Sequence, residues 1–322
     1  MVKQSVSSEN CDLACAKNIV ENFIKDNKYV EAAIYLLEYA ESNDTSTYCH
    51  YGLHEISKKK YVEEVRVNGL DKRIIDYIDG CGSALIHGLT ENYPYQSSLQ
   101  EAVLEGSNFC NKMFNAESAN WYNCIHGVGH GLAVISDSDI TMSAKACQEV
   151  SAIKRAVEGC VFGVYMQDKD DIVKDDSLSY QEIEKRLIKT CDEAIDQMFC
   201  LPSYAQVFAK FGQDKKYVEL CREKYGVIEE CLARLGFYKV VLAPKNSKNL
   251  EEVLYQEVKS CTDSAENLME YSACVAFIAH GIEGVGLKDV DKNLICNLLT
   301  RLEESYAISE DSYQRPKCAL WE

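Results

Sequence analysis

The sequence predicts an all-α protein of repeated helical hairpins, stapled by disulfides and closed into an α/α toroid, with an open α-solenoid as the alternative. Three observations predict this class. Hydrophobic residues make up 47% of the 322 residues, the usual share of a globular chain. Only 4 of the residues are prolines, which leaves room for long helices. Similar segments that begin with cysteine recur every 31 to 43 residues, the length of a helix–turn–helix unit.

The recurring segments define the elements in order. Each continues from its cysteine into a stretch rich in glycine, alanine, valine and aromatic residues, which we expect to form the inner helix of a hairpin. More charged amphipathic stretches lie between them and are expected to form outer, solvated helices. Glycine recurs in one column of the segments, which predicts a close approach of neighbouring inner helices. The segments begin at Cys49, Cys81, Cys124, Cys160, Cys200, Cys231 and Cys274.

The two ends of the chain are expected to cap this array of hairpins. Residues 1–46 precede the first repeat and are predicted to form N-terminal capping helices. Residues 286–322 follow the last repeat and are predicted to form a C-terminal cap. No linker or change of composition divides the chain, so a single domain over residues 1–322 is predicted.

Disulfides explain the 16 cysteines better than metal–thiolate sites do. No C-x-x-C motif of the kind found in zinc–thiolate or covalent haem sites is present. In most repeats a second cysteine ends the outer stretch shortly before the repeat cysteine, so a bridge would join the two helices of one hairpin. The expected pairs are Cys110–Cys124, Cys147–Cys160, Cys191–Cys200, Cys221–Cys231, Cys261–Cys274 and Cys296–Cys318. The other four, Cys11, Cys15, Cys49 and Cys81, can pair in three ways, which the sequence leaves open.

The density of paired cysteines predicts an oxidising compartment and therefore an extracytoplasmic location, whether secreted, periplasmic or at the cell surface. Residues 1–11 lack the apolar stretch of a signal peptide, so we expect that a leader has been removed. No apolar run approaches the roughly 18 residues needed to cross a membrane. The 51 acidic residues outnumber the 34 basic ones, and the resulting net charge of -17 argues against a nucleic-acid partner.

All six histidines lie in the predicted inner helices. Two pairs are spaced i, i+4, so the two imidazoles of each pair share one helix face. Three imidazoles with an open coordination position are typical of a catalytic metal site. The best candidate set is His87, His126 and His130, with His50 and His54 as a second set. The sixth histidine, His280, occupies the same repeat column as His87 and is also a candidate ligand.

The position of His280 in the last repeat favours the closed toroid. In an open superhelix this histidine would lie several repeats away from the others. If the hairpins close into a ring, the seventh repeat meets the first, and the histidine-bearing repeats form one continuous arc. The sequence therefore predicts a polar histidine pocket at one end of an inner barrel.

The predicted function is that of a transition-metal-binding protein, with a redox metalloenzyme as its more specific form. Because the thiols would be engaged in disulfides, the ligands would be imidazoles and nearby carboxylates such as Glu55, Glu91 and Glu283. Imidazole suits copper, iron, zinc and nickel alike. Copper is expected first, because of the oxidising compartment and because Met166 lies in the histidine column, with iron or zinc as the other options.

Two alternatives remain at this point. In the first, the protein is a disulfide-stapled scaffold for protein–protein binding, and its histidines are core residues that bond to main-chain carbonyls. In the second, it stores or delivers metal, binds it weakly and has no turnover. The sequence identifies neither a small-molecule substrate nor a protein partner.

The segment CIHGVGHGLAV, which begins at Cys124, resembles a group of cysteine-paired helical-repeat proteins with C-x-H-G-x-G-H-G segments. This resemblance covers about the central third of the chain and implies no activity. The His-Gly pairs are also similar to those of the lanthionine cyclase family, a seven-hairpin α/α barrel with a zinc site. That family holds zinc through cysteine thiolates, and its zinc motifs do not align with this chain. The resemblance therefore implies only the toroid architecture, and no residue role is carried over.

Overall fold

The computed structural model describes residues 11–43, 46–57, 59–75, 78, 80–93, 95, 98–136, 139–175, 177–194, 196–243, 250–284, 297, 298, 300 and 301. These residues are largely helical and include no strand, which confirms the predicted all-α class. The chain divides into two compact units, residues 1–168 and 169–322, and each is described by itself. The single domain expected over residues 1–322 stays a prediction. Among the described residues, no helix is long and apolar enough to cross a membrane.

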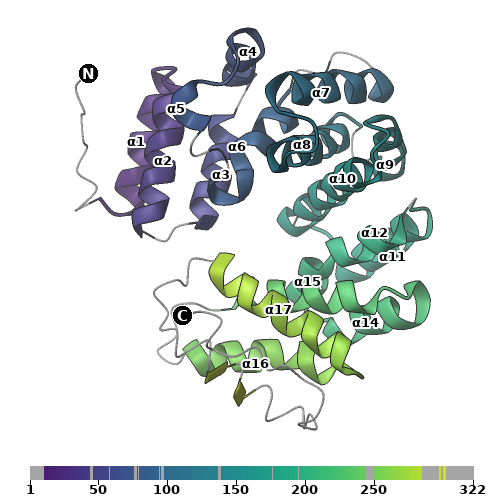
Figure 1. Cartoon of the computed structure of the whole chain (residues 1–322). Coiled ribbons are helices and arrows are strands. Elements are labelled where there is room, and N and C mark those ends of the chain that lie inside the picture. Colours follow the sequence, from purple (N-terminus) through teal and green to yellow (C-terminus); the bar gives the residue numbers. More distant parts are fainter. Residues whose placement is uncertain are drawn as a thin grey trace. The chain divides into compact units, whose positions relative to one another are not determined.

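The first unit consists of successive helices that are labelled in Figure 1. The first two helices correspond to the predicted N-terminal cap, and α10 continues past residue 168 into the second unit. The helices are α1 (Leu13–Lys25), α2 (Tyr29–Asn43), α3 (Ser46–Ile56), α4 (Lys59–Asn68), α5 (Lys72–Ile75), α6 (Gly80–Glu91), α7 (Leu99–Met113), α8 (Ala119–Ile135), α9 (Ile140–Ala146) and α10 (Lys154–Lys174). A short 3₁₀ turn, Cys147–Glu149, follows α9.

The second unit contains α11 (Tyr180–Asp192), α12 (Gln197–Ser203), α13 (Ala205–Lys210), α14 (Asp214–Glu219), α15 (Ile228–Leu242), α16 (Leu250–Asp263) and α17 (Leu268–Gly284). A π-helical turn, Leu220–Tyr225, follows α14. The fifth repeat segment was expected to form one inner helix, but it breaks at Tyr204 into α12 and α13. Pro202 lies inside α12 close to this break, and its missing N–H withdraws one backbone hydrogen bond from that helix. Nearly all of the predicted cap over residues 286–322 lies outside the described residues.

Outer and inner helices differ as their sequences predict. The outer helix α11 begins with a capping box between Ser179 and Glu182, which satisfies two backbone N–H groups at its start. It buries only one stripe, Ile183, Leu187 and Cys191, at a spacing of four residues. The inner helix α8 is buried on most sides, from Trp121 to Ala133. Helix α11 therefore buries one stripe and exposes the rest of its surface, whereas α8 is largely enclosed.

All fourteen cysteines in the described part of the chain form disulfides. Five of the bridges join the outer and inner stretches of one hairpin, and they are Cys110–Cys124, Cys147–Cys160, Cys191–Cys200, Cys221–Cys231 and Cys261–Cys274. The pairing that the sequence left open is Cys11–Cys15 and Cys49–Cys81. The second of these joins two inner helices, α3 and α6. The expected bridge between Cys296 and Cys318 lies outside the described residues.

The inner helices α3, α6, α8 and α10 pack side by side in chain order (Figure 1). Glycine permits the closest of these contacts. A Cβ atom on Gly129 of α8 would overlap the carbonyl oxygen of Cys160 in α10, and one on Gly163 would overlap the carbonyl oxygen of His126. The backbones therefore approach more closely than any larger residue allows. This close packing brings the histidines of successive inner helices together.

Candidate metal centre

Five histidines of the first unit form one continuous strip of rings across α3, α6 and α8. They are His50, His54, His87, His126 and His130. The two rings of each i, i+4 pair have centroids 4.9 Å apart. His87 lies between the pairs, with centroid distances of 6.2 Å to His50 and 5.0 Å to His126. We call these five residues the histidine strip.

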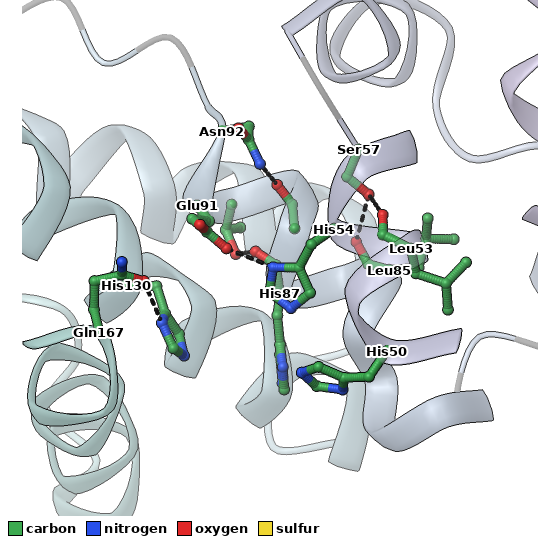
Figure 2. A network of polar contacts seen from close by, with 12 residues as sticks. His50, Leu53, His54, Ser57, Leu85, His87, Glu91, Asn92, His130 and Gln167 are labelled. Carbon is green, nitrogen blue, oxygen red and sulfur yellow. Dashed lines mark hydrogen bonds and ion pairs between the residues drawn. The ribbon is translucent and has the colours of Figure 1, made fainter. Parts of the chain in front are cut away.

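Three members of the strip form a candidate metal site. His50 and His54 of α3 and His87 of α6 each offer a ring nitrogen within 4.8 Å of the other two. Figure 2 shows their side chains converging from the two neighbouring helices. Within the described residues, this is the group of three potential ligands that lies close enough to share an ion. We call it the histidine triad.

The two histidines of α3 are oriented by acceptors on α6. The Nδ1–H of His50 donates to the carbonyl oxygen of Cys81 at 2.9 Å, and the Nδ1–H of His54 donates to Glu91 Oε2 at 2.6 Å. Because a carbonyl or carboxylate oxygen only accepts, both Nδ1 atoms carry the proton and both Nε2 atoms carry a lone pair. An imidazole that binds a metal is usually held in this way, with its other nitrogen donating to a carboxylate or carbonyl.

Two ring nitrogens of the triad are buried without a hydrogen-bond partner among the described residues, namely Nε2 of His54 and Nε2 of His87. Burial lowers the pKa of His87 well below its ordinary value, and the neighbouring histidines, led by His126, lower it further. His87 is therefore neutral at pH 7 and able to donate a lone pair. A buried polar atom without a partner costs about 1–3 kcal/mol, and a bound ion would remove that cost.

The other pair of the strip, on α8, is oriented by α10. The Nδ1–H of His126 donates to the carbonyl oxygen of Gly159 at 3.0 Å, and the Nδ1–H of His130 donates to Gln167 Oε1 at 3.1 Å. The two Nε2 atoms of the pair lie 3.2 Å apart. Figure 2 shows His130 and Gln167 joined in this way.

The structure groups the expected ligands differently from the sets predicted from the sequence. His87 shares the triad with His50 and His54, whereas the sequence placed it first with His126 and His130. The side chain of His280 lies outside the described residues.

The carboxylates that were expected as additional ligands do not lie where the sequence spacing suggests. Glu91 bonds to His54 of the neighbouring helix and not to His87, although it lies four residues after His87. Glu55, beside His54 in sequence, is exposed, and the side chain of Glu283 lies outside the described residues. Met166 is half-buried on α10, which packs against α8.

Gln167 and the carbonyl acceptors were not among the predicted site residues, and Glu91 was expected as a metal ligand and not as the acceptor of a ring N–H. One signal could have found both side-chain acceptors. Glu91 follows His54 by 37 residues, and Gln167 follows His130 by the same 37 residues. This is the length of one repeat, so an acceptor at that offset lies on the next inner helix.

A comparison of the chain with protein-family models, curated proteins and solved structures finds no match. Fold and site together define a disulfide-stapled helical protein with a histidine strip on its inner helices.

Proposed function

We propose that this protein is an extracytoplasmic transition-metal-binding protein that holds an ion between His50, His54 and His87. The observation that carries the proposal is a pair of buried Nε2 atoms, on His54 and His87, that have no hydrogen-bond partner in the described part of the chain. They belong to a group of three ligand atoms no more than 4.8 Å apart. The Nδ1 bonds of His50 and His54 support it, because they aim the Nε2 lone pairs.

Three imidazoles leave a coordination position for water or a substrate, as in catalytic zinc sites. His50 and His54 are half-buried, so solvent reaches one side of the triad. Imidazole binds copper, iron and zinc, so the triad suits all three. Copper is the first choice because the proposed compartment is oxidising. A redox-active ion with an open position would make the protein a metal-dependent oxidoreductase, which is the finer form of this proposal.

The disulfides support the proposed location, because bridges of this number persist in oxidising compartments. Closure of the repeats into a toroid is part of the same proposal and rests on the order of the histidine-bearing repeats. Small-angle scattering of the intact protein tests it, since a ring and an open superhelix of this length differ in radius of gyration.

One observation favours the alternative function as a binding scaffold. His50 and His126 donate to main-chain carbonyls of the next inner helix, as core histidines do. In that case the strip joins neighbouring repeats and binds no metal.

Metal analysis of protein purified without a histidine tag separates the two functions. The protein is loaded with copper or zinc, dialysed and analysed for metal per chain. We expect a bound ion whose affinity falls at least tenfold in His54→Gln and His87→Gln. The control is Glu55→Gln, an exposed position next to His54, which should bind like the parent. Substoichiometric metal that neither histidine variant changes would support the scaffold.

A further inference from the structure

The second histidine pair repeats the design of the first. His126 and His130 follow His50 and His54 by 76 residues each. In both pairs the first histidine donates from Nδ1 to a main-chain carbonyl of the next inner helix, and the second donates to a side-chain oxygen 37 residues further on. The arrangement that supports a metal at the first pair is therefore present twice.

The contact between His126 and His130 has a geometry that a cation would stabilise. Both Nδ1 atoms donate to oxygen acceptors, so both Nε2 atoms present lone pairs, and these atoms lie 3.2 Å apart. With the Gln167 amide oriented in this way, a cation between the two Nε2 atoms, either a proton or a metal ion, stabilises the contact. Two ligands bound at about 2.0 Å to a tetrahedral ion are about 3.3 Å apart. The pair is thus already at the spacing that such an ion requires.

We infer that His126 and His130 form a second transition-metal site, next to the histidine triad, in which water or a small anion completes the coordination. Two histidines at i, i+4 on one helix face form the same kind of ligand pair as in helical zinc motifs. The site goes beyond the proposed function and shares no ligand with the triad, so either site can fail alone. His87 lies between the two, with its ring nearest to His126 at 5.0 Å.

The two sites differ in the group that orients their second histidine. Glu91 accepts from His54 as a carboxylate, whereas Gln167 accepts from His130 as a neutral amide. A carboxylate makes the imidazole more basic, and loss of such a partner weakens metal binding about 10- to 100-fold. The second site also has one histidine fewer. It therefore binds its ion more weakly than the triad does.

The rival occupant of the second site is a proton shared by the two Nε2 atoms. It would satisfy the same 3.2 Å contact without any metal. The ring nitrogens distinguish the two cases, because a shared proton and a bound zinc ion shift the ¹⁵N resonances of Nε2 differently.

The test is a zinc titration of the tag-free, disulfide-intact protein, followed by calorimetry and by ¹⁵N NMR of the histidine rings. We expect two ions per chain, the second bound at least tenfold more weakly. In the double variant His126→Gln, His130→Gln the weaker step disappears and the tighter step stays. Gln167→Glu should strengthen only the weaker step, about tenfold or more.

Each result has a definite reading. The inference is overturned if the double variant still binds two ions. It is also overturned if the Nε2 resonances of His126 and His130 are those of a shared proton and do not change when zinc is added. The same titration shows separately whether the triad binds metal. If it does not, His54→Gln leaves the tighter binding step unaffected.

Discussion

At the scale of single residues, Glu91 is the orienting group whose effect can be measured most simply. It accepts the Nδ1–H of His54 at 2.6 Å and thereby holds the tautomer whose Nε2 faces the triad. Glu91→Gln should lower the affinity of the triad for zinc about 10- to 100-fold, because an amide oxygen is a weaker acceptor than a carboxylate. Competition with a chromogenic chelator measures the change. An affinity equal to that of the control Glu55→Gln would show that Glu91 does not orient the ligand.

The lowered pKa of His87 predicts a pH dependence of stability in metal-free protein. The folded state holds this histidine neutral, whereas the unfolded state binds a proton below about pH 6.5. Stability is therefore fully present above that pH and falls below it, by up to about 1.4 kcal/mol per pH unit until the folded pKa is reached.

Guanidinium unfolding at about pH 5 and about pH 7.5, in the presence of a chelator, measures this dependence. Other titrating groups contribute to both proteins, so the parent is compared with His87→Gln, in which the side chain at this position does not titrate. The variant should lose less stability on acidification. Equal losses in the two proteins would rule out His87 as the source.

The histidines themselves are predictable from the sequence, but their grouping is not. They lie in two columns of the repeat about four residues apart, and the i, i+4 spacing places His50 with His54 on one helix face. Whether His87 joins that pair or the pair on α8 depends on small offsets between neighbouring helices, which spacing along one helix does not encode. The partner of Glu91 is hidden for the same reason, since the contact crosses from one repeat to the next.

At the scale of helices, two glycines make a matched test of the close packing of α8 and α10. Alanine at position 129 would place a Cβ atom on the main chain of Cys160, whereas alanine at position 159 would meet nothing within 4 Å. Gly129→Ala should therefore destabilise the protein by about 1–3 kcal/mol or more. Gly159→Ala should stabilise it by up to about 1 kcal/mol, because alanine favours the helix. Thermal unfolding measures both, and equal shifts would contradict the packing described for this contact.

The bridge Cys110–Cys124 is predicted to secure the hairpin that carries His126 and His130. It closes a segment of sequence separation 14 between α7 and α8. Replacing both cysteines by alanine should cost about 2–4 kcal/mol and increase hydrogen exchange across both helices. The matched control removes Cys191–Cys200 in the other unit, with a sequence separation of 9. If exchange in α8 increased equally in the control, the local role of the bridge would be disproved.

The hairpins are predictable because a cysteine marks the start of each inner segment. Two features of the structure were not predicted in this way. The pairing of Cys49 with Cys81 was left open, since neither has an outer-helix cysteine shortly before it. The break at Tyr204 follows Pro202, which the cysteine alignment alone overlooks. Repeat length predicts the succession of elements, but it does not show where one of them is interrupted.

At the scale of the whole molecule, few prolines and a regular repeat are enough to predict an all-α chain. The division into two compact units is not predictable in this way, because it falls at residue 168 inside the continuous helix α10. The residues around the boundary, 167–171, read QDKDD and are polar, but they continue a helix and contain no glycine or proline, so they do not read as a linker. The five described histidines of the strip all lie in the first unit, which also contains the triad.

Anomalous X-ray diffraction from crystals of copper- or zinc-loaded protein tests the central claim most directly. Data on both sides of the metal absorption edge locate the ion without reference to its expected position. We predict an anomalous peak within bonding distance of a ring nitrogen of each of His50, His54 and His87. Loaded crystals with no anomalous peak between His50, His54 and His87, and with the same ring orientations, would contradict the proposed metal centre.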